Sequence, residues 1–139
     1  MKDGQSATLE TLIHKIKKMA YDEYLADRSR QILKQKHVYF EEKKMMGSLC
    51  FMVDEKMCFA ISIDKDTDSS RMMARIGKEN YKKTLQQPHC RPMDITGQKM
   101  KSYIYVDADG MDTEEDLEHW IQLCLDFNPL AKKSKKSKK

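Results

Sequence analysis

A histidine, a cysteine and an arginine stand side by side near the middle of the chain, in the heptapeptide Pro88–Asp94 (PHCRPMD). A nucleophilic cysteine needs a base within hydrogen-bond reach and surroundings that lower its pKa. Neighbouring residues of an extended segment point to opposite sides, so His89 and Arg91 face away from Cys90. We therefore expect Cys90 to be a packed or incidental thiol. His89 and Arg91 form a small cationic feature, for which anchoring to a carboxylate such as Asp94 is the structural interpretation.

Other patterns that carry chemistry are missing from the sequence. The four histidines are scattered without metal-binding spacing, and no P-loop, dinucleotide-binding or GxSxG motif occurs. The acidic run Asp107–Asp116 does not fit a calcium loop, because Gly110 is its fourth residue rather than its sixth. Acidic residues there suit the start of a helix. The sequence thus predicts a protein that is not an enzyme, with no cofactor and no metal site.

Charge is unevenly distributed along the chain. The net charge is +4 over 139 residues, but the tail 132–139 holds six lysines, which leaves −2 for the rest. We expect this tail to be disordered, with weak, salt-dependent contact to polyanions as its functional interpretation. Residues 1–18 read as an N-terminal extension with helical spacing, and 19–131 as one domain. Without a bilayer-spanning apolar run or a signal peptide, we expect a cytoplasmic protein with no membrane contact.

Three helices are predicted from N-cap residues and apolar stripes. The first runs from about Asp22, a suitable N-cap, to Lys36. The second spans 78–87 between Gly77 and Pro88. The third spans about 113–127, begins with a capping box of Asp112 and Glu115, and buries a stripe that consists of Leu117, Trp120, Ile121 and Cys124.

Strands are expected at 44–53, 57–63, 71–76 and 101–106, with 90–96 extended or irregular. Parity favours a three-residue turn, 54–56, between the first two, because Val53 then faces Met57 and the bulky residues share one face. This register makes Cys50 and Cys58 diagonal neighbours on the other face, about 7–8 Å apart. Such a distance is poor for a disulfide, so we expect free thiols. The order of elements favours a two-layer α+β domain with a mainly antiparallel sheet.

The second face of this sheet is the most informative functional candidate. If the helices cover one face, the other carries methionines and tyrosines, and two arginines share the parity of Met73. Such an apolar and basic face suits a protein partner, a second copy of the chain, or stacked bases, unless residues 1–18 shield it. Together with the cationic pair of the heptapeptide, the candidate partner- or anion-binding residues are Arg71, Arg75, His89, Arg91, Tyr103, Tyr105, Met52 and Met73.

Short motifs, in order from Met19 to Ala131, resemble the TfoX/Sxy N-terminal domain family. They include MAYDEYLADR, KMMG, LCFMV, RIG, PH followed by RPMD, and LDFNPL. The resemblance implies an α-β(3)-α-β(2)-α fold similar to secretion-chaperone-like domains. It also implies a part in the regulation of natural competence through protein contacts, with no catalytic residues to carry over. The family's full-length regulators carry a second, C-terminal domain, where this chain has its lysine tail.

Two functions follow as expectations. The first is a small non-enzymatic binding module that acts in transcription regulation through protein–protein contacts. The alternative is a nucleic-acid-binding accessory protein that uses the arginines and tyrosines of the sheet together with the lysine tail. A thiol or hydrolytic enzyme centred on Cys90 ranks last.

Overall fold

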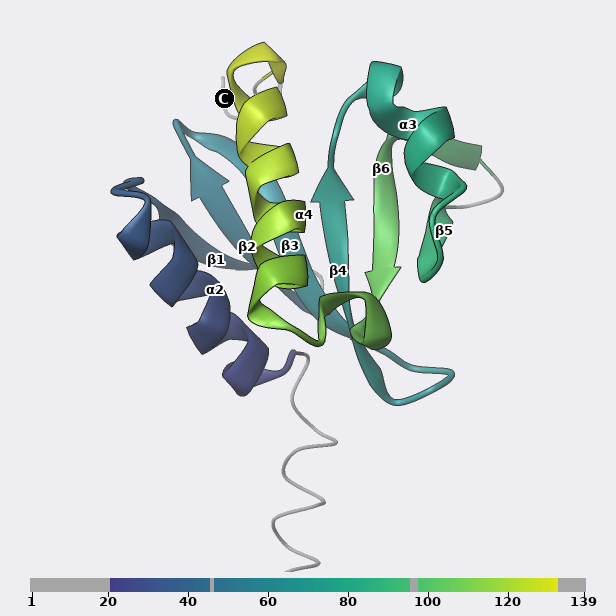
Figure 1. Ribbon diagram of the computed structural model, residues 1–139, viewed down its shortest axis with the longest axis horizontal. Helices are drawn as coiled ribbons and strands as arrows, with labels where there is room; N and C mark the ends of the chain where they lie inside the picture. Colours follow the sequence, from purple (N-terminus) through teal and green to yellow (C-terminus); the bar gives the residue numbers. More distant parts are fainter. Residues whose placement is uncertain (1–20, 46, 96–97, 133–139) are drawn as a thin grey trace, which may run out of the picture.

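A computed structural model describes residues 21–45, 47–95 and 98–132, with only the backbone described at positions 94, 95, 98 and 99 (Figure 1). Six strands form one antiparallel sheet in the order β1-β2-β3-β4-β6-β5. The elements are α2 (Glu23–Gln35), β1 (Glu41–Met45), β2 (Ser48–Val53), β3 (Lys56–Asp64), β4 (Ser69–Arg75), α3 (Lys78–Leu85), β5 (Cys90–Ile95), β6 (Gln98–Asp107), the 3-10 turn η1 (Ala108–Met111), α4 (Glu114–Phe127) and the 3-10 turn η2 (Asn128–Leu130). The predicted α+β class is confirmed.

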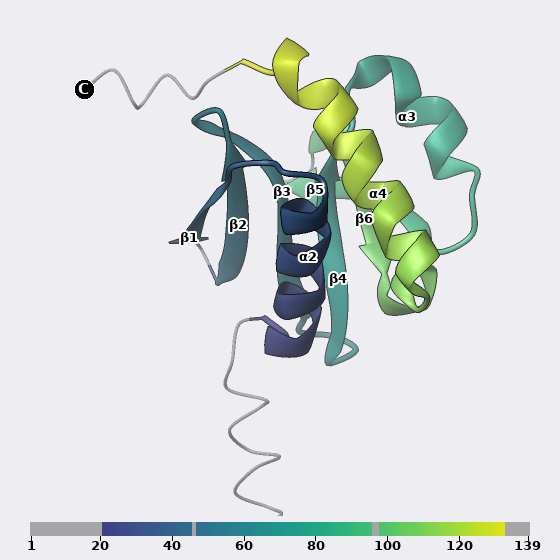
Figure 2. The same ribbon diagram turned by 60° about the vertical axis from the view of Figure 1, so that its left-hand side comes forward.

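The three helices and the sheet enclose one core. Figures 1 and 2 show α2 and α4 side by side over one face of the sheet, with α3 beyond α4 over β6 and β5. The Phe51 and Phe59 rings stack in this core with their centres 4.6 Å apart. The predicted stripe of α4 is confirmed, since Leu117, Trp120, Ile121 and Cys124 are all buried. Within the described residues, no helix has the length and apolar character to cross a bilayer.

One predicted strand, 44–53, is in fact two. β1 and β2 pair antiparallel with Met45 opposite Ser48, and Gly47 adopts a φ of 77° at the turn between them. Glycine reaches this region without steric cost. The prediction missed the division because all five residues of β1 are exposed and four are charged, so no apolar alternation marks a strand. The observed order is therefore α-β(4)-α-β(2)-α over the described residues.

The β2–β3 turn also differs from the prediction. Val53 pairs with Lys56 around a two-residue turn, and both turn residues have positive φ, 56° at Asp54 and 64° at Glu55. Such turns match the twist of a hairpin. A bulge next to Phe51 then shifts the register, so that Phe51 pairs with Phe59 as the predicted parity requires. The predicted three-residue turn is therefore wrong, whereas the predicted pairing of Phe51 with Phe59 is confirmed.

The bulge also moves Cys58. This residue joins the core between helices and sheet, whereas Cys50 lies outside that cluster. The prediction that Cys50 and Cys58 share a face is therefore wrong, because it assumed unbroken alternation along β3. All four cysteines are free thiols, as expected.

The starts of α2 and α4 are capped by short polar side chains. Asp22 caps α2 as predicted, and its Oδ1 accepts hydrogen bonds from the N–H groups of Tyr24 and Leu25 at 2.9 and 3.4 Å. The cap of α4 is Thr113, whose Oγ1 accepts from the N–H of Asp116 at 3.0 Å. The predicted capping box of Asp112 and Glu115 was one residue early. The predicted extension 1–18 and all but the first residue of the lysine tail lie outside the described residues.

Candidate functional site

The face of the sheet that is turned away from the helices is called the outer face here. It is made of residues that alternate with core positions: Met52, Ala60, Ser62, Asp64, Arg71, Met73, Arg75, Arg91, Tyr103, Tyr105 and Asp107. Ala60 is only 1% exposed, so the larger side chains around it cover the sheet backbone there. Seven of the eight candidate residues thus lie on the outer face, all except His89. Met52 lies on β2, two strands away from Met73 on β4.

Arginines of β4 stack on tyrosines of β6. The guanidinium carbon of Arg71 lies 3.9 Å from the centre of the Tyr105 ring, and that of Arg75 lies 5.5 Å from the centre of the Tyr103 ring. Both distances fall within the range of cation–π attraction. One face of each ring is therefore occupied by a guanidinium from the chain itself.

Two carboxylates neutralise two of the outer-face arginines. The Asp64 Oδ2 lies 3.7 Å from the Arg71 Nη1 and 3.4 Å from the Arg91 Nη2. Asp107 accepts a further hydrogen bond from the Arg91 Nε at 3.0 Å. Asp64 and Asp107 anchor Arg91; the side chain of Asp94, the expected partner, lies outside the described residues.

The buried Asp64 carboxylate is held ionised. The pKa of Asp64 is lowered, first by the N–H of Asp66, which donates to its Oδ1 at 3.0 Å, and further by the nearby Arg71 and Arg91, while burial acts in the opposite direction. Hydrogen bonds with Asp107 are the largest cause that raises the pKa of Arg91. The centre of the outer face is thus a paired network and not a bare basic patch.

Arg75 is held differently, by backbone carbonyls. Its Nη1 donates to the Met57 carbonyl at 3.2 Å, and its Nη2 donates to the Lys132 carbonyl at 3.1 Å. Its Nε is buried without an acceptor among the described residues. Arg75 therefore ties the end of the described chain to the outer face.

His89 and Cys90 of the heptapeptide Pro88–Asp94 lie in different surroundings. His89 is exposed, has a φ of 68° at the turn into β5, and accepts a hydrogen bond from the N–H of Asp107 through its carbonyl at 2.8 Å. Cys90 packs against the core instead. Burial, and then the nearby Asp107, raise the pKa of Cys90 to about 11, so its thiolate is scarce at neutral pH. The described residues include no cluster of three His, Cys, Asp or Glu that could hold a metal ion.

Both edges of the sheet are protected against strand addition. The exposed edge strand β1 carries two glutamates and two lysines, and the opposite edge strand β5 carries Pro92 and a shifted register. Charges, prolines and bulges at edges block pairing with another chain. The outer face is therefore better suited than either edge strand to contact another molecule.

Asp64 and Asp107 are the site residues that the prediction missed. Asp64 was read as the start of a polar loop, and Asp107 as part of the acidic run before α4. Parity along β6 was the available signal, since Asp107 follows Tyr103 and Tyr105 on the same face and lies opposite Arg71.

Comparison with protein families agrees with the motifs. Residues 31–128 match the TfoX N-terminal domain, a range that contains all six strands of the sheet together with α3 and α4. No curated protein and no solved structure matches the chain. The family match spans most of the sequence, and the chain therefore belongs to the TfoX N-terminal domain family.

Proposed function

We propose that this protein is a non-catalytic binding module that docks a protein partner through the outer face of its sheet. The carrying observation is the pair of arginine–tyrosine stacks, Arg71 on Tyr105 and Arg75 on Tyr103, beside the half-buried Met73. Tyrosine, arginine and methionine are the residue types enriched in protein interfaces. Family membership supports a partner in the regulation of competence or transcription, within the cytoplasm.

Preorganisation supports this proposal. Each stack holds a long arginine side chain in place, so less conformational entropy is lost when a partner binds. Asp64 also fixes Arg71 from the side through an ion pair, and it pairs with the neighbouring Arg91. A rigid, amphipathic surface of this kind suits a folded partner surface that contributes apolar and polar contacts.

Nucleic-acid binding is less well supported. Base stacking would require a free tyrosine face, and a guanidinium already lies over one face of Tyr103 and of Tyr105. The charges of Arg71 and Arg91 are paired with carboxylates, which weakens attraction to phosphates. Binding of a labelled single-stranded oligonucleotide at low salt, lost in an Arg71→Gln, Arg75→Gln double variant, would favour this alternative over the proposal.

The test is a capture experiment with matched tyrosine variants of the full chain. Immobilised wild type is expected to retain a specific protein from a lysate of the native cell, and Tyr103→Ser, Tyr105→Ser is expected to lose it. The control, Tyr24→Ser, Tyr39→Ser, removes two tyrosines that are 73% and 78% exposed and belong to neither stack. We expect the control to retain the protein. Equal retention by both double variants, or no retained protein at all, would contradict the proposal.

A further inference from the structure

Arg75 stands apart from the other outer-face arginines. Arg71 and Arg91 form ion pairs with Asp64 or Asp107, whereas no carboxylate of the described residues lies within ion-pair distance of Arg75. A guanidinium offers five N–H donors. Two of them meet the carbonyls of Met57 and Lys132, and the buried Nε meets no acceptor in the described part of the chain. The remaining Nη hydrogens of this half-buried guanidinium have no acceptor in the described part of the chain and can donate to a bound anion.

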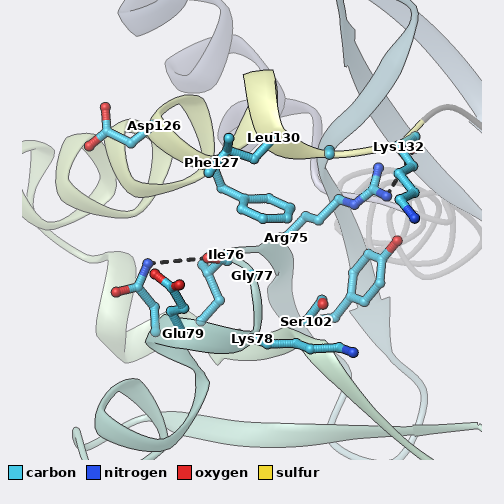
Figure 3. A pocket seen from close by; sticks show the side chains of 13 residues that line it. Arg75, Ile76, Gly77, Lys78, Glu79, Ser102, Asp126, Phe127, Leu130 and Lys132 are labelled. Carbon is cyan, nitrogen blue, oxygen red and sulfur yellow. Dashed lines mark hydrogen bonds between the residues drawn. The ribbon is translucent and has the colours of Figure 1, made fainter.

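A pocket opens beside this arginine. It has a volume of about 520 Å³ and lies between the end of β4, the start of α3 and the segment that follows α4 (Figure 3). That volume is within the range of small-molecule sites, about 300–1,000 Å³. The pocket is thus large enough for a small ligand and is adjacent to the unpaired charge.

The lining combines an apolar wall with a cationic rim. Phe127 and Leu130 provide apolar surface, and Leu130 is 75% exposed, so its side chain is accessible to a ligand. Lys78 and Lys132 also line the pocket, and neither pairs with a carboxylate among the described residues. Three cations therefore border one apolar surface.

The two acidic residues of the pocket have other contacts or roles. Asp126 accepts a hydrogen bond from the Gln122 Nε2 at 2.8 Å and lies on the side of the pocket away from Lys132 (Figure 3). Glu79 is in the first turn of α3, where its charge complements the helix dipole. The cationic side around Arg75 is left without a partner in the described residues.

We propose that this pocket binds a small amphipathic anion. Its carboxylate or phosphate group would meet the unused donors of Arg75 with Lys78 and Lys132 beside it, and its apolar body would lie against Phe127 and Leu130. The pocket shares Arg75 and Tyr103 with the proposed protein contact, but anion binding can be tested without any partner and its failure would leave that contact untouched.

The test is a titration of the full chain followed by amide NMR. Phenylacetate and phenyl phosphate are the anionic probes, and phenylacetamide is the neutral control of the same shape. We expect saturable shifts of the amides of Gly77, Ser102 and Phe127 with either anion, and affinity at least about tenfold lower for the neutral amide. The two anions distinguish a carboxylate site from a phosphate site.

Matched variants locate the charge that binds. Arg75→Gln is expected to weaken binding at least about tenfold, while Arg71→Gln, on the same strand but paired with Asp64, keeps it. If Arg75→Gln does not fold, Lys78→Gln against Lys34→Gln on α2 provides the same comparison with exposed lysines. Equal binding of the neutral amide, shifts outside the pocket, or unchanged affinity in both the Arg75 and the Lys78 variants would overturn the proposal.

Discussion

The guanidinium carbon of Arg71 lies 3.9 Å from the centre of the Tyr105 ring, while Asp64 holds the same guanidinium from the side. Arg71 is thus shared between a ring and a carboxylate, and both contacts restrict its position on the outer face. The equivalent stack of Arg75 on Tyr103 is wider, at 5.5 Å. The closer contact should contribute more to stability, because the attraction falls as the cation leaves the ring.

A double-mutant cycle measures this contact. We expect Arg71→Met and Tyr105→Leu to be coupled by about 0.5–1 kcal/mol in the free energy of unfolding, since each removes one partner of the cation–π pair. The same cycle on Arg75 and Tyr103 should give a smaller coupling. Urea denaturation followed by the fluorescence of Trp120, which is buried in the fold, provides the measurement. Additive effects at the closer pair would show that the stack contributes nothing.

Acid should destabilise the protein partly through Asp64. Its pKa in the folded protein lies below the ordinary 3.8, chiefly because of the N–H of Asp66 and with the help of Arg71 and Arg91. The stabilisation is therefore complete above the ordinary pKa and is lost as the pH falls through the lower, folded-state value. Asp64→Asn should lower the free energy of unfolding by about 1–3 kcal/mol at neutral pH.

The pH profile separates this effect from a general loss of stability. The difference between wild type and Asp64→Asn should stay constant down to about pH 3.8 and shrink below it. Protonation of Asp64 in the wild type then removes the same charge that the substitution has already removed. The exposed Asp109→Asn is the control, and its profile should run parallel to the wild type. A difference between Asp64→Asn and wild type that stays constant below about pH 3.8 as well would contradict the assignment.

The thiols should be unreactive in the folded protein. Burial raises the pKa of Cys58 to about 12 and that of Cys90 to about 11, and it also raises the pKa values of Cys50 and Cys124. Since the thiolate is the reacting form, the half-buried Cys90 should react roughly a hundredfold more slowly than a thiol of ordinary pKa near neutral pH.

A disulfide reagent with a coloured product follows this reaction. All four thiols should react rapidly in urea and slowly in buffer, and Cys90→Ser should remove the fastest of the slow phases, because the other three are buried. A thiol that reacts in the folded chain as fast as free cysteine would instead revive the hypothesis of a cysteine enzyme.

Periodicity predicted the parts of the fold that bury an apolar stripe. The stripe of α4 and the pairing of Phe51 with Phe59 both follow from burial on one side. β1 could not be predicted in this way, because its exposed residues pair with β2 through the backbone alone. Cys58 was misplaced because a bulge interrupts the alternation, and a bulge leaves no mark in the apolar pattern.

The same reasoning explains what was predicted of the outer face. Parity correctly placed Arg71 and Arg75 on one face with Tyr103 and Tyr105, since both strands continue without a bulge there. The pairing of charges was not predictable, because Asp64 comes from the end of another strand and its contacts depend on how β3, β4 and β5 align. The close approach of α4 to Gly77 could not be predicted from the sequence either.

Gly77 should be the least replaceable glycine of those with positive φ. Its φ is 89°, and a Cβ added there would lie 2.5 Å from the Phe127 Cδ1. Gly77→Ala therefore combines backbone strain with a steric clash, each costing about 1–3 kcal/mol, and should lower the free energy of unfolding by about 2–5 kcal/mol. Gly47→Ala is the matched control, because Gly47 is exposed and has a similar φ of 77°.

A second substitution separates the clash from the strain. In a Phe127→Leu background the smaller side chain leaves room for the added Cβ, so Gly77→Ala should cost about as much as Gly47→Ala, roughly 1–3 kcal/mol. Urea denaturation, followed by Trp120 fluorescence, of Gly77→Ala and Gly47→Ala with Phe127 and with Leu at that position measures the cost of the clash and the cost of the strain. If Gly77→Ala costs the same with Phe127 and with Leu at that position, the ring of Phe127 does not restrict the glycine. The close contact between α4 and the start of α3 would then be wrong. The proposed anion pocket is lined by residues of this contact, so its geometry would be wrong as well.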